Sequence, residues 1–324
     1  MLELRHGHAL ALNHAVNRAV NHHLTPRIAF MLTLPPLLWA GNAVVGRALV
    51  GSVPPLALNA MRWWLALALL LPLGWRALRS PGDIRSRWRH FALLGLVGVG
   101  SYNALQYLAV QTSTPLNVTL IAASAPVWML LVGLLFYGER PNARQILGAA
   151  LSLAGVLLVI SRGSLQTLRT VTLVPGDLLM LLAIALWAGY SWMLARPPEA
   201  MRGEARPAWN WAEFLLVQVL FGTAWATLAA GAEATLAPAA IHWAPWVVAA
   251  LVYVAVGPSL IAYRAWGLGV STVGPAIAAF FSNLTPVFAG VMSAALLGEA
   301  PSWYHGASFV LIAAGIVVSS MPRR

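Results

Sequence analysis

The sequence predicts an all-α integral membrane protein of ten transmembrane helices, built as two inverted repeats of five helices. Composition is the first reason: of 324 residues, 60% are hydrophobic and 9% are charged, against about 25% charged residues in soluble proteins. Apolar stretches of about 20 residues, the length that spans a bilayer, recur along the whole chain. A motif of the first half also returns in the second half, which indicates that one unit occurs twice.

The repeated motif joins the end of one apolar stretch to the start of the next. Residues 124–141 read SAPVWMLLVGLLFYGERP and residues 284–301 read LTPVFAGVMSAALLGEAP. A shift of 160 residues carries Pro126 onto Pro286 and Glu139 onto Glu299. Proline removes a helical hydrogen bond, so the two prolines either kink their helices or act as hinges of a conformational change. The two glutamates precede the next helix, where its positive end favours a carboxylate in a structural turn.

The expected spans fall into two five-helix units, residues 28–162 and 177–320, which are joined by short loops. No apolar stretch is left over for a soluble domain. The ten spans are expected at residues 28–50, 55–74, 91–110, 115–137, 143–160, 177–195, 211–230, 244–264, 274–297 and 303–320.

Residues 1–27 are expected to form a cytoplasmic tail. They hold five of the eight histidines, His6, His8, His14, His22 and His23. A metal site is the alternative to a solvated tail, and the solvated tail is favoured. The chain has no cysteine, which excludes disulfides and thiolate metal ligands. No cofactor or metal is therefore expected.

Arginine placement predicts the orientation, because cytoplasmic loops of membrane proteins are rich in positive charge. Five arginines lie in the loop of residues 75–90, and further arginines lie in every second loop after it, whereas the opposite loops hold Arg47, Arg162 and Arg169. Both termini are thus expected in the cytoplasm. Five spans per unit is an odd number, so the second unit is inverted relative to the first. The net charge of +11 is explained by these loops, and no nucleic-acid partner is expected.

Polar and aromatic residues inside the spans predict a central substrate pocket. Polar residues are costly in lipid and usually face the interior of a helix bundle. A single one can be an interhelical contact or an interfacial anchor, but several helices present them here. Arg62 in the second span marks function or a buried pair, unless it extends to the membrane surface. The expected substrate-binding residues are Trp39, Asn42, Tyr102, Asn103, Gln106, Trp187, Tyr190, Ser191, Tyr263 and Asn283.

These features together resemble the drug/metabolite transporter superfamily and, within it, the EamA-type exporters. The resemblance is carried by the ten spans, Arg62, the sequences WAGN at 39–42 and WAGY at 187–190, and the turns GERP at 138–141 and GEAP at 298–301. It implies a basket-like bundle around a central cavity and efflux of small metabolites such as aromatic or neutral amino acids. Export of another metabolite or of a cationic drug is the alternative that the resemblance leaves open.

The residues themselves distinguish three classes of function. An intramembrane enzyme needs a catalytic set, and the spans hold no carboxylate pair or His-based relay at mid-depth. A channel needs a constriction with a symmetric ring of ligands. The sequence favours a secondary transporter of the bacterial inner membrane that works by alternating access on a small molecule. It is expected to contact the lipid bilayer, and a monomer is compatible with the sequence.

Overall fold

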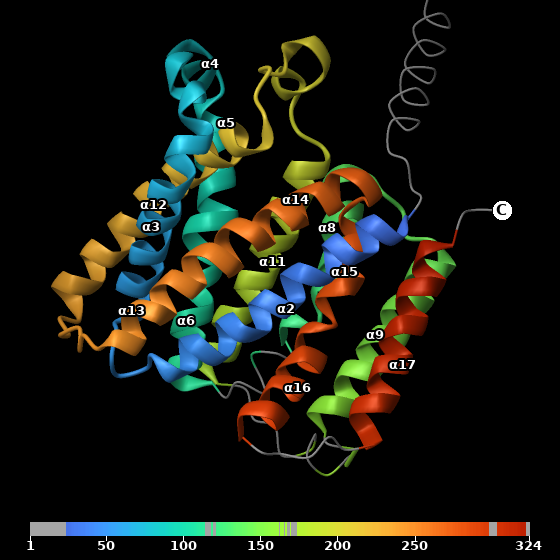
Figure 1. Ribbon diagram of the computed structural model, residues 1–324. Coiled ribbons are helices and arrows are strands. Elements are labelled where there is room, and N and C mark those ends of the chain that lie inside the picture. Colours follow the sequence, from blue (N-terminus) through green and yellow to red (C-terminus); the bar gives the residue numbers. More distant parts are fainter. Residues whose placement is uncertain are drawn as a thin grey trace, which may run out of the picture.

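The computed structural model describes residues 24–113, 118, 121–161, 163, 164, 166, 169, 174–297 and 303–321. The histidine-rich segment 1–23, Pro115, Arg162 and Glu299 lie outside this part. Every regular element within the described part is a helix (Figure 1). In chain order these are α2 (Pro26–Ala48), α3 (Pro55–Gly74), η1 (Trp75–Arg79), α4 (Pro81–Ser86), α5 (Trp88–Leu94), η2 (Gly95–Ser101), α6 (Tyr102–Thr112), α8 (Ala125–Tyr137), α9 (Ala143–Ile160), α11 (Pro175–Ala195), η3 (Glu199–Met201), η4 (Gly203–Ala205), α12 (Trp211–Leu236), α13 (Pro245–Val254), η5 (Ala255–Ile261), α14 (Ala262–Val273), α15 (Pro275–Ser282), α16 (Thr285–Leu297) and α17 (Trp303–Ser320).

Six helical segments of the described part are long and apolar enough to cross a membrane. They are Pro26–Ala48, Pro55–Arg79, Trp88–Thr112, Pro175–Ala195, Trp211–Leu236 and Pro245–Val273. Shorter apolar helices cover Ala125–Tyr137, Ala143–Leu158, Pro275–Ala289 and Gly306–Ser320. Large apolar side chains such as Phe30, Leu135 and Leu228 are exposed on these helices, at 65–66%. A surface of this kind is suited to lipid.

Two irregular features recur in both halves at the same shift of 160 residues. The first is a π-helical segment, η2 in one half and η5 in the other. The second is a turn, at residues 123–124 and 283–284, directly before the helix that carries Pro126 or Pro286. Each proline therefore stands in the first turn of a new helix and not inside a continuous one. That position suits proline, because the first N–H groups of a helix have no partner within it.

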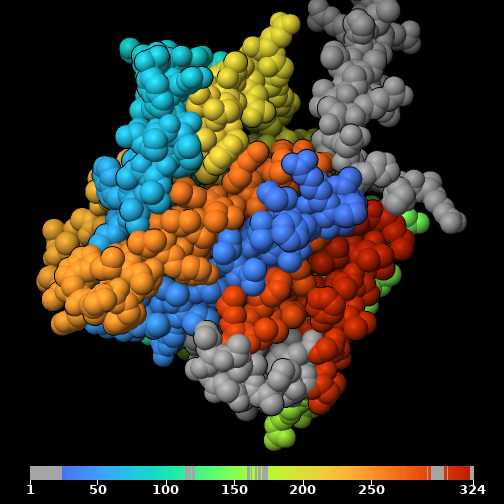
Figure 2. Space-filling model, viewed as in Figure 1, coloured from blue at the N-terminus to red at the C-terminus, as the bar shows by residue number. Residues whose placement is uncertain are grey.

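The two halves interlock through long contacts between helices that are distant in sequence. α9 packs along α17, and α3 packs along α12. α2 packs against α14 and α16, while α11 packs against α6 and α8. On the face seen in Figure 2, α2 lies between the α13–α14 segment and α16. The centre of the molecule is thus built by helices from both halves.

The arginine-rich loops lie together at one end of the bundle. α4 and the segment after α11 form the upper end in Figure 1, and the start of α2 and the end of α17 lie toward that same side. Arg87 joins the two loops, because it pairs with Asp83 at 2.9 Å and donates to the backbone oxygens of Ala200 at 2.8 Å and Ala205 at 2.6 Å.

Glu139 takes a different partner from the one expected. It follows Gly138, whose φ of 66° ends α8 in the left-handed conformation, and its carboxylate pairs with Arg196 after α11. The start of α9 is instead capped by Asn142, whose Oδ1 accepts the Gln145 N–H at 2.8 Å. Glu139 is a turn residue that ties two loops together, since a closer amide side chain already satisfies the end of α9.

Candidate functional site

An aromatic cluster occupies the meeting point of the two halves. The centroids of five rings lie 5.0–5.5 Å from the Trp187 ring, at distances typical of favourable ring pairs. α2 and α6 contribute from the first half, and α11 and α14 from the second. The aromatic cluster consists of Trp39, Tyr102, Trp187, Tyr190, Tyr263 and Trp266.

The π-helical segments hold this cluster through their backbone carbonyls. Trp39 Nε1 donates to the Pro258 oxygen at 3.3 Å, and the Tyr263 hydroxyl donates to the Gly98 oxygen. Gly98 and Pro258 are equivalent under the shift of 160 residues. A π turn changes the regular hydrogen-bond ladder, and such turns are frequent at functional sites. A side chain at Gly98 would collide with the Tyr190 ring, so glycine is required for that ring to approach.

A polar network lies beside the aromatic cluster and is centred on Arg62, which is fully buried. Its guanidinium donates to Ser259 Oγ at 2.7 and 2.9 Å, to Tyr107 Oη at 2.7 Å and to Asn42 Oδ1 at 3.2 Å. Asn42 Nδ2 in turn donates to Gln106 Oε1 at 3.1 Å. The polar network therefore joins α2, α3, α6 and η5 at mid-bundle.

A small central cavity lies beside the aromatic cluster and also touches Gln106 of the polar network. Its volume is about 30 Å³, and its walls include Trp39, Tyr102, Gln106 and Trp187. This volume holds about one water molecule. Ser282, which also lines it, has a buried hydroxyl with no partner among the described residues, and the amide of the adjacent Asn283 is buried and unpaired in the same sense. Unpaired buried polar atoms at the end of α15 indicate a place that a water or a ligand fills.

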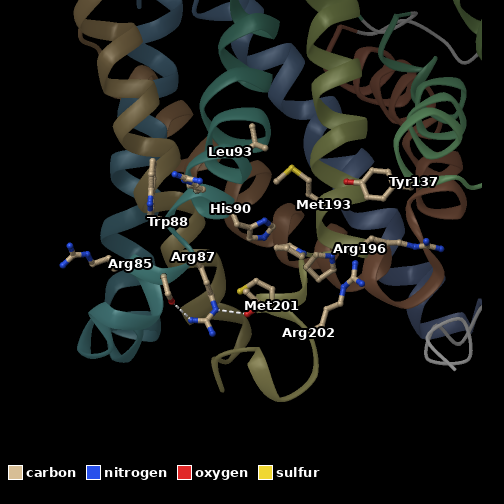
Figure 3. A pocket seen from close by; sticks show the side chains of 15 residues that line it. Arg85, Arg87, Trp88, His90, Leu93, Tyr137, Met193, Arg196, Met201 and Arg202 are labelled. Carbon is tan, nitrogen blue, oxygen red and sulfur yellow. Dashed lines mark hydrogen bonds between the residues drawn. The ribbon is translucent and has the colours of Figure 1, made fainter. Parts of the chain in front are cut away.

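A larger vestibule opens at the arginine-rich end (Figure 3). Its volume is about 750 Å³, and it lies between α5, the ends of α8 and α11, and the loop after α11. Figure 3 shows His90 and Arg202 among its walls, whereas Arg85 points away from the others. The cationic residues that line it are Arg85, Arg87, Arg89, Arg196 and Arg202. A concave surface of one charge attracts ligands of the opposite charge.

A third cavity reaches from this end toward the aromatic cluster. It has a volume of about 150 Å³ and lies between α11, α12 and α14. Arg206 and Arg264 line it together with Tyr190 and Tyr263 of the cluster. Tyr190 donates to Gln218 Oε1 at 3.1 Å in its wall. The cluster is thus approached from the arginine-rich end.

The structure brings most of the expected site residues together. Trp39, Tyr102, Trp187, Tyr190 and Tyr263 form the aromatic cluster, and Asn42, Asn103 and Gln106 belong to the polar network. Ser191 adjoins the cluster, since its Oγ accepts the Trp266 N–H at 3.0 Å. Asn283 stands apart at the end of α15. Their use as a substrate site stays a prediction.

Trp266 was missed from the sequence, which left open whether Arg62 is buried or extends to the membrane surface. Trp266 lies three residues after Tyr263 and shares its face, so helical spacing could have found it. Arg62 does not extend to the membrane surface, because neutral oxygens from three other elements surround its guanidinium. Only the packing of those elements reveals this.

The model of the EamA-like transporter family matches residues 26–161 and again residues 174–321. The chain belongs to this family. The resemblance to EamA-type members of the drug/metabolite transporter superfamily is thereby confirmed, and the two matched segments correspond to the two halves described above. The protein is a membrane transporter of the EamA-like family, and the family assignment does not indicate an enzyme.

Two relatives and one solved structure match nearly the whole EamA-like chain. An uncharacterized transporter of Archaeoglobus fulgidus is 28% identical over 292 residues, which cover 90% of this chain and 96% of the relative. The aromatic amino acid exporter YddG of Ancylobacter novellus is 25% identical over 300 residues, covering 89% and 95%. A solved crystal structure aligns with a TM-score of 0.69 at 22% identity, covering 90% of this chain and 94% of that chain, and shows the shared fold.

Proposed function

We propose that this EamA-like transporter exports small metabolites from the cytoplasm by alternating access. Within this class, the proposed substrates are aromatic or neutral amino acids. The observation that carries the proposal is the aromatic cluster around Trp187, which four helices from both halves build at the centre of the bundle. Aromatic faces bind apolar side chains well, and the neighbouring amides supply polar partners. The name of the YddG relative, an aromatic amino acid exporter, supports this substrate class.

The proposed architecture is ten spans in two inverted repeats, within a bacterial inner membrane and with both termini in the cytoplasm. The interlocked packing supports it: α2 of the first half contacts α14 and α16 of the second, and α11 of the second contacts α6 and α8 of the first. This exchange of partners is what a twofold relation between inverted halves produces. The arginine-rich end is the cytoplasmic one by the positive-inside rule.

Transport would proceed by rocking the two halves about the central site. The vestibule of about 750 Å³ at the cytoplasmic end and the central cavity of about 30 Å³ fit a state with a closed centre. Opening the centre would use the turns before Pro126 and Pro286 as hinges, because a helix that is interrupted there bends at low cost. A gradient of substrate from the cytoplasm would drive export.

Counterflow in proteoliposomes tests the proposal. Vesicles with purified protein are loaded with unlabelled tryptophan, phenylalanine or leucine, and uptake of the labelled compound is followed. A carrier gives transient accumulation that depends on the internal substrate, whereas a channel gives simple equilibration. Vesicles with the Trp187→Ala variant serve as the control, since they should show little accumulation. Counterflow with cationic drugs but with no amino acid would contradict the proposed substrate class, although the protein would still be a carrier.

A further inference from the structure

Arg62 is a buried charge whose partners in the described part are all neutral. Its guanidinium is fully buried and is held by Ser259, Tyr107 and Asn42. The ion pairs found among the described residues join Arg87 to Asp83 and Arg196 to Glu139, and neither involves Arg62. The rings of Trp63 and Tyr107 lie 5.2 and 5.8 Å from its Cζ and add cation–π contacts.

Burying the charge of Arg62 among neutral partners costs free energy. A charge inside a membrane protein loses its hydration, and neutral oxygens replace it only in part. If Arg62 served packing alone, a neutral side chain of similar size would do so without that loss. A buried guanidinium in a transporter therefore suits a ligand of opposite charge that binds and is released during transport.

Arg62 is linked to the central cavity through two hydrogen bonds and does not line it itself. Asn42 accepts from Arg62 at 3.2 Å and donates to Gln106 at 3.1 Å, and Gln106 lines the cavity. Trp39, which lines the same cavity, lies three residues before Asn42 on one face of α2. One end of a small ligand would thus meet the aromatic rings while its other end lies within reach of the guanidinium.

The fully buried guanidinium of Arg62 lies on the α3 side of the site, whereas the α12 side differs at mid-bundle. α3 packs along α12. Tyr190 of WAGY aligns with Asn42 of WAGN, and whereas Asn42 is bound by Arg62 of α3, Tyr190 is bound by the neutral Gln218 of α12. An asymmetric pair of walls orients an asymmetric ligand, with its anionic end toward α3 and its apolar end toward Trp187.

We propose that Arg62 is the binding residue for the carboxylate of the transported substrate. In the closed state Asn42 Oδ1, Tyr107 Oη and Ser259 Oγ occupy the donors that the carboxylate takes when the site opens. A guanidinium offers two parallel N–H groups that match a carboxylate. The inference rests on the proposed function and narrows its substrates to compounds that pair a carboxylate with an apolar or aromatic body.

The test compares tryptophan with tryptophan amide, which keeps the ring and the amine but lacks the anionic group. In counterflow, the wild-type protein should prefer tryptophan by at least about tenfold in KM. Arg62→Gln should raise the KM for tryptophan by about tenfold or more and leave that for the amide nearly unchanged. Arg62→Lys, which keeps the charge but loses the paired N–H groups, should recover part of the preference. Arg47→Gln is the matched control, because Arg47 is exposed at the end of α2 and donates to the Val110 oxygen.

Thermal unfolding separates a binding role from a structural one. Arg62→Met should unfold at the same temperature as the wild type or higher, since it removes a buried charge whose lost hydration is only partly replaced. It should also lose the stabilisation that added tryptophan gives the wild type. Equal transport of tryptophan and its amide by the wild type would overturn the assignment of Arg62 and leave the proposed export intact. Equal losses for both compounds in Arg62→Gln and Arg62→Lys, together with a lower unfolding temperature of Arg62→Met, would also overturn it. Absence of counterflow for every compound would instead refute the proposed function.

Discussion

The contact between α9 and α17 makes a sharp prediction about stability, because glycine brings the two backbones together there. A Cβ on Gly315 would lie 2.7 Å from the Gly148 carbonyl oxygen and would collide with Ser152 Oγ. Ordinary contact begins at 3.4 Å, so Gly315→Ala forces the helices about 0.7 Å apart along this seam. Overpacking of this kind costs about 1–3 kcal/mol, and alanine recovers up to about 1 kcal/mol through its helix propensity. The expected net loss is about 1–2 kcal/mol.

Thermal unfolding of the purified protein, followed by tryptophan fluorescence, measures this loss. The midpoint of Gly315→Ala should fall by about 2–6 °C, given a few degrees per kcal/mol for a chain of this size. Gly306→Ala on the same helix is the control: its Cβ would meet nothing within 4 Å, so its midpoint should stay or rise. The KM for substrate should not change in either variant, because the aromatic cluster is built on other helices. A midpoint of Gly315→Ala at or above that of Gly306→Ala would refute the backbone contact.

Three further predictions concern the site, the hinge and the topology. Trp187→Ala should raise the KM for an aromatic substrate about tenfold or more, because five ring contacts are lost, whereas Trp64→Ala, on the exposed face of α3, should leave it unchanged in the same flux assay. Pro286→Ala should slow exchange with little change in substrate affinity, since it lets α15 and α16 join into a stiffer helix; faster exchange would argue against a hinge. Tags at both termini should report a cytoplasmic location, and a periplasmic signal from either would contradict the ten-span count.

The local sequence pattern was enough to predict most of the helix boundaries. The predicted span at 211–230 corresponds to α12, which begins at Trp211, and the span at 303–320 corresponds to α17. These boundaries follow from the length of apolar runs and from proline at helix starts, which are properties of contiguous residues. The sequence predicted only in part that the fourth and ninth spans are interrupted. Proline marks the position, but whether a helix kinks or restarts depends on what its neighbours pack against.

The candidate site shows the same division. Helical spacing placed Trp39 and Asn42 on one face of their helix, and Trp187 and Tyr190 on one face of theirs. It did not show that Arg62 meets Ser259, 197 residues away in the chain, because a contact between distant segments depends on the packing of both halves.

The sequence by itself determined the membrane class, the repeat and the set of helices that carry polar groups, because hydropathy and periodicity are local quantities that each residue contributes on its own. The tertiary structure alone decided that these groups converge. The aromatic rings meet around Trp187 only where α2, α6, α11 and α14 come together. Arg62 is buried only because three other elements close over it. Burial and distance depend on how all the helices pack together, so local sequence patterns do not reveal them.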